Sequence, residues 1–180
     1  MKNIAKLFAI IGVVVAITLV VGFFPNLQTE VQAASTDYYS PFDLAYSPNG
    51  SWIAVSDITK GKLVIINAST GAVARTVTLS GQPKGVAWSS SNMVYVAEYD
   101  GGNASGNVVE IDPTDGSIDR RWYTGPKPYG VTVAGTKLIV TDFGLGKATV
   151  INLTSGSIEG DVDVDDYPSF LTATTDDTYA

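Results

Sequence analysis

The sequence predicts an all-β protein, and two observations support this prediction. Only 16% of the residues are charged, 18 are glycine, and no long run of strong helix formers follows the N-terminal region. The second observation is an internal repeat of 40 to 45 residues, within which four short strands alternate with turns. Four antiparallel strands at this period have the dimensions of one β-propeller blade. We therefore predict a β-propeller with three complete four-stranded blades and the start of a fourth.

The N-terminal region has the pattern of a signal peptide. Lys2 and Lys6 precede an uncharged apolar stretch from Leu7 to Phe24. Ala33 supplies the small residue before a cleavage site, so we expect export and cleavage after Ala33, with residues 1–33 as signal peptide and 34–40 as a short leader. An uncleaved anchor is the alternative, because this apolar stretch is near the lower limit for a bilayer-spanning helix. Either reading predicts an extracellular or cell-envelope location.

The first strand of each repeat unit begins at a proline. Pro41, Pro83, Pro128 and Pro168 open similar segments that are 42, 45 and 40 residues apart. We therefore expect the propeller to cover 41–180, with blades at 41–82, 83–127 and 128–167 and a partial blade at 168–180.

The remaining strands follow at matching distances in each unit. The expected second strands are Trp52–Asp57, Val94–Glu98 and Leu138–Asp142. The expected third strands are Leu63–Asn67, Val108–Asp112 and Thr149–Asn152. The expected fourth strands are Val73–Leu79, Ile118–Tyr123 and Ile158–Val164. A β-sandwich would contain strands but would not explain this period.

The best-defined motifs lie in the second unit. They are Pro-x-Gly-Val-Ala from Pro83, Tyr-Val-Ala-Glu at 95–98 and Val-x-x-Ile-Asp-Pro-Thr-Asp-Gly at 108–116. This pattern resembles the YVTN/YncE-like repeats of bacterial and archaeal cell-surface propellers, and the resemblance covers Pro41 to Ala180. The first and third units depart from it, because Ile53-Ala-Val and Ile139-Val-Thr replace the Tyr-Val core. WD40-like units fit less well, since their Gly-His and Trp-Asp pairs are absent.

Three repeats and part of a fourth are fewer blades than most propellers contain. Propellers close with four to eight blades. We therefore expect the sequence to be part of a longer propeller of six to eight blades, with closure by association between chains as the alternative. Large aromatic residues are expected to fill the spaces between blades. These residues are Tyr46, Trp52, Trp88, Tyr95 and Trp122.

The residue types that are missing narrow the chemistry. The chain has no histidine and no cysteine. This removes disulfides, c-type haem attachment, the usual zinc ligands and the Ser-His-Asp triad from this part of the protein, and no catalytic residue is predicted. The net charge is −7, which repels phosphate backbones, so nucleic acid is not an expected partner. A membrane is an expected partner only through an uncleaved anchor.

Candidate ligand-binding residues fall on one propeller face, which is formed by the loops before each inner strand and after each second strand. The first set of loops contributes Phe42, Lys84, Lys127 and Tyr129, and the second contributes Asp57, Glu98, Tyr99, Asp142 and Phe143. The three acids either converge on a cation or polar ligand, or they cap turns or pair with nearby lysines. Exposed rings at Tyr99, Tyr129 and Phe143 would suit a sugar or a protein partner.

Asp161, Asp163 and Asp165 are weak candidate calcium ligands. They alternate with valines, so a strand would place all three on one face. The run lacks the glycine and the final glutamate of an EF-hand loop. A solvent-facing outer strand explains the same pattern, and no other cofactor is predicted.

Three functions are compatible with these observations. The first is an exported cell-surface or secreted propeller that acts as a non-enzymatic binding scaffold for a protein, a glycan or a wall polymer. The second is a propeller enzyme of the lactonase or lyase type that uses a divalent cation. The third is a structural component of an envelope layer, in which blades add edge to edge.

Overall fold

The structure is a computed structural model that describes residues 39–101 and 106–174. The predicted signal peptide and most of the leader, through residue 38, lie outside the described residues, as do 175–180. Within the described ranges, no helix is long and apolar enough to cross a membrane.

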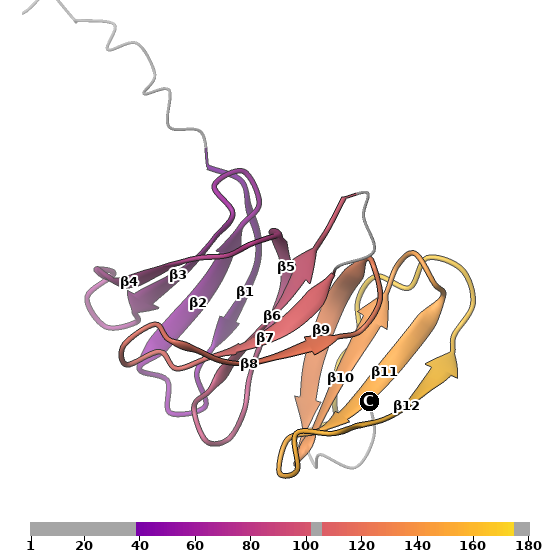
Figure 1. Ribbon diagram of the computed structural model, residues 1–180. Coiled ribbons are helices and arrows are strands. Elements are labelled where there is room, and N and C mark those ends of the chain that lie inside the picture. Colours follow the sequence, from indigo (N-terminus) through magenta and orange to yellow (C-terminus); the bar gives the residue numbers. More distant parts are fainter. Residues whose placement is uncertain (1–38, 102–105, 175–180) are drawn as a thin grey trace, which may run out of the picture. The chain divides into compact units, whose positions relative to one another are not determined.

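The strands form three antiparallel four-stranded sheets that follow one another in chain order (Figure 1). Blade 1 contains β1 (Pro41–Tyr46), β2 (Trp52–Asp57), β3 (Lys62–Asn67) and β4 (Val73–Thr78). Blade 2 contains β5 (Gln82–Trp88), β6 (Val94–Tyr99), β7 (Asn107–Ile111) and β8 (Ile118–Tyr123). Blade 3 contains β9 (Pro128–Ala134), β10 (Lys137–Asp142), β11 (Lys147–Asn152) and β12 (Ile158–Asp163). The predicted all-β architecture with three complete four-stranded blades is confirmed.

The three blades repeat the same register. In each blade the pairing of the first strand with the second shifts just after the proline, and the pairing of the third strand with the fourth shifts near the end of the third. Such bulges change which side of the sheet a residue faces. Because they recur, a residue in one blade has a counterpart in the next, and Asp57, Glu98 and Asp142 are one such set.

Two hydrophobic cores lie between neighbouring blades. The core between blades 1 and 2 contains Ala54, Leu63, Ile65, Val77, Leu79, Val86, Trp88, Val94, Val96, Val109 and Ile111. The core between blades 2 and 3 contains Ala87, Tyr95, Ala97, Val108, Trp122, Val131, Leu138, Val140 and Ile151. The inner strands β1, β5 and β9 contact one another in sequence. The sheet of blade 2 therefore buries both of its faces.

Four of the five aromatic residues predicted between blades lie there, and Tyr46 does not. Tyr95 is 1% exposed, Trp88 and Trp122 are buried, and Trp52 packs against the first core. Tyr46 is 62% exposed. Its counterpart Trp88 is buried because blade 1 covers it, and its Nε1 donates to the carbonyl of Ala45 at 2.9 Å. No described blade covers the corresponding face of blade 1.

The fourth unit differs from the expected start of a blade because residues 168–174 form no strand. The segment nevertheless lies where an inner strand should lie. The Ser56 hydroxyl of blade 1 donates to the carbonyl of Lys84 in β5 at 2.7 Å. The Thr141 hydroxyl of blade 3 donates in the same way to the carbonyl of Ser169 at 3.3 Å. Within the described residues, the segment has no second strand to pair with. It therefore lies at the position of an inner strand but forms no ladder of backbone hydrogen bonds.

Candidate functional site

The three acids that follow the second strands hold their own loops together. Asp57 and Asp142 are 3% and 0% exposed. Oδ1 of Asp142 accepts from the backbone N–H groups of Gly144 and Leu145, both at 2.8 Å, and Oδ2 accepts from the N–H of Lys127, also at 2.8 Å. Oδ1 of Asp57 accepts in the same manner from Ser40 at 3.2 Å and Lys60 at 3.1 Å. Each acid therefore joins the turn after its strand to the segment before the inner strand.

Glu98 occupies the same place in blade 2 and is 1% exposed. Its Oε1 accepts from the N–H of Ser80 at 2.9 Å, and its Oε2 forms an ion pair with Arg121. These contacts match the interpretation in which the acids cap turns. The groups that the three carboxylates contact are backbone N–H groups and an arginine side chain, and not lysine side chains. Lys127 takes part through its backbone.

Lys84 lies among three aromatic rings. Its Nζ is 4.6 Å from the centroid of Phe42, 5.1 Å from that of Tyr99 and 5.4 Å from that of Tyr129. These distances are within the range of cation–π attraction. The rings come from β1, β6 and β9, so all three blades contribute to this cluster. The sequence-predicted residues Lys84, Tyr99 and Tyr129 are thus brought together with Phe42.

The Lys84 ammonium is partly desolvated, and burial lowers the pKa of this side chain below its usual value. Within the described residues, no carboxylate forms an ion pair with Lys84. The aromatic rings attract the charge but accept no conventional hydrogen bond. Its three N–H donors are therefore available to a ligand.

A platform of stacked rings continues the cluster. Tyr129 stacks on Phe143 with centroids 5.4 Å apart, and Phe42 stacks on Phe170 at 6.1 Å. Phe143 also contacts Tyr167 at 5.0 Å. Phe170 is 68% exposed and Tyr167 is 65% exposed. We call Phe42, Lys84, Tyr99, Tyr129, Phe143, Tyr167 and Phe170 the ring face.

Sequence reasoning missed Phe170 and Tyr167. Phe170 lies one position later than Phe42 and Tyr129 relative to the proline of its unit, so strict repeat alignment places Ser169 on the face instead. Tyr167 has a φ of 59°, a left-handed conformation that is uncommon for a residue with a large side chain. Tertiary contact with Phe143 accompanies this conformation, and no local pattern signals it.

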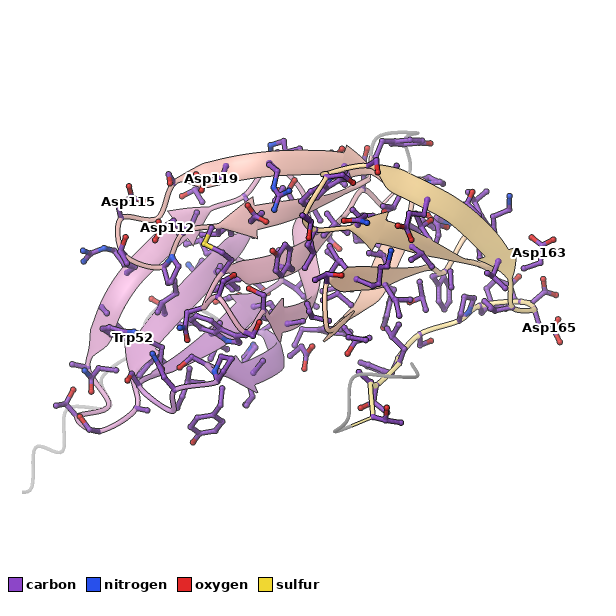
Figure 2. All side chains as sticks on the ribbon, turned by 90° about the horizontal axis from the view of Figure 1, so that it is seen from below. Trp52, Asp112, Asp115, Asp119, Asp163 and Asp165 are labelled. Atoms are coloured by element: carbon purple, nitrogen blue, oxygen red, sulfur yellow. The ribbon has the colours of Figure 1, made fainter. Side chains whose placement is uncertain are left out.

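Asp161 and Asp163 share one face of β12, and Asp165 does not belong to this strand. Asp163 is the last residue of the strand, and Asp165 lies beyond it with a φ of 74°. The predicted alternation of Asp161, Asp163 and Asp165 is therefore wrong at Asp165, because the strand ends first. Figure 2 shows Asp163 and Asp165 at the end of blade 3 and Asp112, Asp115 and Asp119 around the distant β7–β8 turn. No three acidic side chains of the described residues are grouped so as to hold a metal ion.

A second polar cluster lies between blades 2 and 3. The hydroxyl of Tyr95 donates to Oε2 of Glu110 at 2.7 Å, and Arg120 pairs with both oxygens of Glu110. Nη1 of Arg120 donates to the carbonyl of Leu153 at 2.8 Å, and its guanidinium stacks 4.9 Å from the Trp122 ring. Burial and the Glu110 carboxylate raise the pKa of Tyr95 far above its usual value. Glu110 has the hydrophobic counterparts Ile65 and Val150, so the repeat gave no signal for this cluster.

No protein-family model and no curated protein matches the chain. Solved structures do match it. Hydrazine synthase of Kuenenia stuttgartiensis has a TM-score of 0.70 at 21% identity, over 82% of this chain and 42% of that chain. Streptogramin B lyase has a TM-score of 0.63 at 17% identity, over 76% and 46%. The WD40 repeats of RRP9 have a TM-score of 0.67 at 13% identity, over 75% and 42%.

These similarities identify the fold and leave the function open. The chain spans less than half the length of each of these neighbours. At identities of 21% and below, similarity of structure does not transfer an activity. The neighbours include a synthase, a lyase and a set of WD40 repeats, so proteins named for different activities share this architecture. The three sheets, their register and these neighbours together establish that the chain has the β-propeller fold.

Proposed function

We propose that the protein is an exported, non-enzymatic propeller that binds carbohydrate of the cell surface or wall at the ring face. The observation that carries this proposal is the position of Lys84, which presents an ammonium group among the rings of Phe42, Tyr99 and Tyr129. The signal-peptide pattern supports export with cleavage after Ala33, and the YVTN/YncE-like motifs support a cell-surface role.

The chemistry of the ring face suits a sugar. A pyranose ring has a flat side of C–H groups, which carry partial positive charge and pack on the electron-rich face of an aromatic ring. Phe170 and Tyr167 are both largely exposed, and the rings beneath them fix their positions. The Lys84 ammonium can then donate hydrogen bonds to sugar oxygens at the border of the stack. This combination of apolar faces and a few polar groups is typical of small-ligand sites.

The lactonase or lyase hypothesis requires acidic side chains that are free to bind a divalent cation. The acids near the ring face are already occupied by other contacts. Asp57 and Asp142 are each committed to backbone N–H groups, and Glu98 is paired with Arg121. Binding a cation through these carboxylates would break contacts that hold the loops. The contacts of the described residues therefore favour the scaffold over the lactonase or lyase alternative.

Binding of the purified chain to chitohexaose, to cellohexaose and to insoluble peptidoglycan tests this proposal. We expect measurable binding to at least one of these glycans, lost in Tyr129→Ala. Tyr123→Ala is the matched control, because Tyr123 is a 53% exposed tyrosine on β8 that makes no ring contact with this cluster. No binding to any of the three glycans, or equal loss in both variants, would contradict the proposal.

A further inference from the structure

A hollow of about 270 Å³ lies between blades 2 and 3, at the opposite ends of the strands from the ring face. It is lined by the turns after β5, β9 and β11 and by side chains of β6, β7 and β8. Met93 borders it just before β6, whereas Tyr99 of the ring face is the last residue of the same strand. The hollow is therefore separate from the ring face, and two complete blades form it.

Buried polar side chains line part of this hollow. Tyr95 and Glu110 are 1% and 5% exposed, and Arg120 pairs with Glu110. Three of the five N–H groups of Arg120 donate to Glu110 and to the carbonyl of Leu153, and the Tyr95 oxygen is a nearby acceptor for a fourth. At least one N–H group of this partly exposed guanidinium is therefore left to donate to a ligand.

Hydroxyl groups stand at the rim of the hollow. The side chains of Ser90, Thr136 and Thr154 are exposed there, and their hydroxyls form no hydrogen bond with another described residue. Each hydroxyl can donate one hydrogen bond and accept two. The rim can therefore both donate to and accept from the hydroxyl groups of a ligand.

The hollow also has apolar surface. Met93 and Leu153 line it, and both pack against the core between blades 2 and 3. They offer contact to the C–H groups of a ligand whose hydroxyls face the rim. Its volume is slightly below that of sites for drug-sized molecules, which suits a single sugar ring.

The charges of the hollow favour a neutral ligand. Among the described residues that line it, only Glu110 and Arg120 are charged, and they pair with each other. A charged ligand would lose hydration without meeting an unpaired opposite charge. A neutral polyhydroxyl ligand has no such penalty.

Packing alone does not require this polar cluster. The counterparts of Tyr95 and Glu110 between blades 1 and 2 are Ala54 and Ile65, which are both fully buried in an apolar core. Apolar residues in place of a buried ion pair are often neutral or stabilising. The polar groups beside the hollow therefore have a use other than stability, and binding of a ligand is such a use.

We propose that this hollow is a second binding site, which takes one neutral monosaccharide unit. Arg120 donates to a sugar oxygen, and the Thr136 and Thr154 hydroxyls exchange hydrogen bonds with sugar hydroxyls. The C–H side of the sugar ring packs on Met93. The site does not depend on binding at the ring face.

The methyl group of Met93 can report on this site. The chain has only two methionines, Met1 and Met93. The purified chain, isotope-labelled in its methionine methyl groups, is titrated by NMR with glucose, galactose, mannose and N-acetylglucosamine. We expect one signal, identified by its loss in Met93→Leu, to shift saturably with at least one of these sugars.

Two variants separate the rim hydroxyls from the rest of the fold. The double variant Thr136→Val, Thr154→Val removes two hydroxyls at nearly constant shape, and we expect about tenfold weaker affinity for the bound sugar. The matched control is Thr114→Val, because Thr114 holds the position of Thr154 in the third turn of blade 2 and does not line the hollow. Its affinity should equal that of the parent, and urea unfolding should show that both variants are folded.

Charged analogues test the class of ligand. The uronic acid and the amino sugar that correspond to the bound sugar should each bind about tenfold more weakly, because neither charge finds an unpaired partner. Tyr129→Ala, which alters the ring face, should leave the Met93 shift unchanged. Failure at the ring face and failure at the hollow are therefore distinguishable.

Three results would overturn the proposal. One is a Met93 signal that moves with none of the four sugars. Another is an equal loss of affinity in Thr114→Val and in the double variant, which would place the sugar elsewhere. The third is tighter binding of either charged analogue than of the neutral sugar, which would exclude a neutral ligand.

Discussion

The two interfaces between blades use different physical means to solve the same packing problem. Between blades 1 and 2 the core is entirely hydrophobic, and Leu63, Ile65 and Val109 are fully buried. Between blades 2 and 3, Glu110 is the counterpart of Ile65 and forms a hydrogen-bonded cluster with Tyr95 and Arg120. The backbone arrangement is therefore the same at both interfaces, whereas the side chains at the centre of an interface can be either apolar or charged.

The two interfaces also differ at the outer strand. Arg75 and Arg120 hold equivalent positions, and each donates to a carbonyl in the third turn of the next blade, Thr114 and Leu153 respectively. Only Arg120 also has a buried carboxylate partner. Equivalent residues thus differ in energetic importance because their surroundings differ. The predictions below exploit such matched positions.

The largest effect is expected at the outer-strand position that contains Trp122 in blade 2 and Val77 in blade 1. Both are 7% exposed, but Trp122 also donates from Nε1 to the carbonyl of Gly156 at 2.8 Å. Trp122→Ala should destabilise the chain by about 3–5 kcal/mol, because a large cavity remains. Val77→Ala should cost about 1–2 kcal/mol, since fewer methylene groups are lost. Urea unfolding of the two variants measures the difference, and equal costs would contradict it.

The second largest difference in stability is expected between variants of Arg120 and of Arg75. Arg120→Leu leaves Glu110, whose side chain is only 6% exposed, without its ionic partner. We expect a loss of about 2–3 kcal/mol, somewhat below the range for a fully buried pair because Arg120 itself is partly exposed. Arg75→Leu removes only exposed hydrogen bonds and should cost less than about 1 kcal/mol. Thermal unfolding of both variants at neutral pH measures the two losses of stability. A larger loss in Arg75→Leu than in Arg120→Leu would contradict this prediction.

A smaller loss of stability is expected when the Ser56 hydroxyl, which links the inner strands β1 and β5 through hydrogen bonds, is removed. Ser56 Oγ accepts from the N–H of Asp43 at 3.1 Å and donates to the carbonyl of Lys84 at 2.7 Å. Blade 2 has Ala97 at this position and forms its interface without the hydroxyl. Ser56→Ala should therefore cost about 1 kcal/mol, the net value of a typical hydrogen bond. A cost of several kcal/mol in urea unfolding would mean that the hydroxyl is indispensable.

The smallest net change is expected when the charged interface is converted to the apolar kind. The triple variant Tyr95→Phe, Glu110→Ile, Arg120→Leu removes all three polar partners together, so no buried charge is left alone. Replacement of a buried ion pair by packed apolar residues is often neutral or stabilising. We expect unfolding free energies within about 1 kcal/mol of the parent. A loss as large as that of Arg120→Leu alone would show that the polar cluster itself stabilises the interface.

The fold could be predicted because the repeat supplies several independent landmarks. The prolines, the acids after the second strands and the glycine-containing third turns fix the register. Strands β2 and β8 begin and end at the predicted residues, and β1 begins at the predicted Pro41. The end of β12 and the lack of strand structure at 168–174 could not be predicted in this way. Both depend on neighbours beyond the local sequence, which a repeat pattern assumes to be present.

The ring face was only half predictable. Repeat alignment placed Lys84, Tyr99, Tyr129 and Phe143 near one another, and the structure brings them into contact. The alignment also grouped the acids with them, because it fixes where a residue lies in a blade but not which way its side chain points. The Asp142 side chain points toward its own loop because it accepts hydrogen bonds from the backbone N–H groups there.

The binding role of the ring face can be measured most directly at Lys84. The ε-methylene protons of a lysine held among three rings are shifted to low frequency by ring currents, and contact with a ligand changes that shift. In NMR spectra of chain labelled at lysine, we predict one such signal, lost in Lys84→Met, that moves on addition of a glycan bound in the panel above. The signal of Lys137, which pairs with Glu159 in blade 3, should remain unchanged. An unshifted Lys84 signal, or one that does not respond while the glycan binds, would contradict the account.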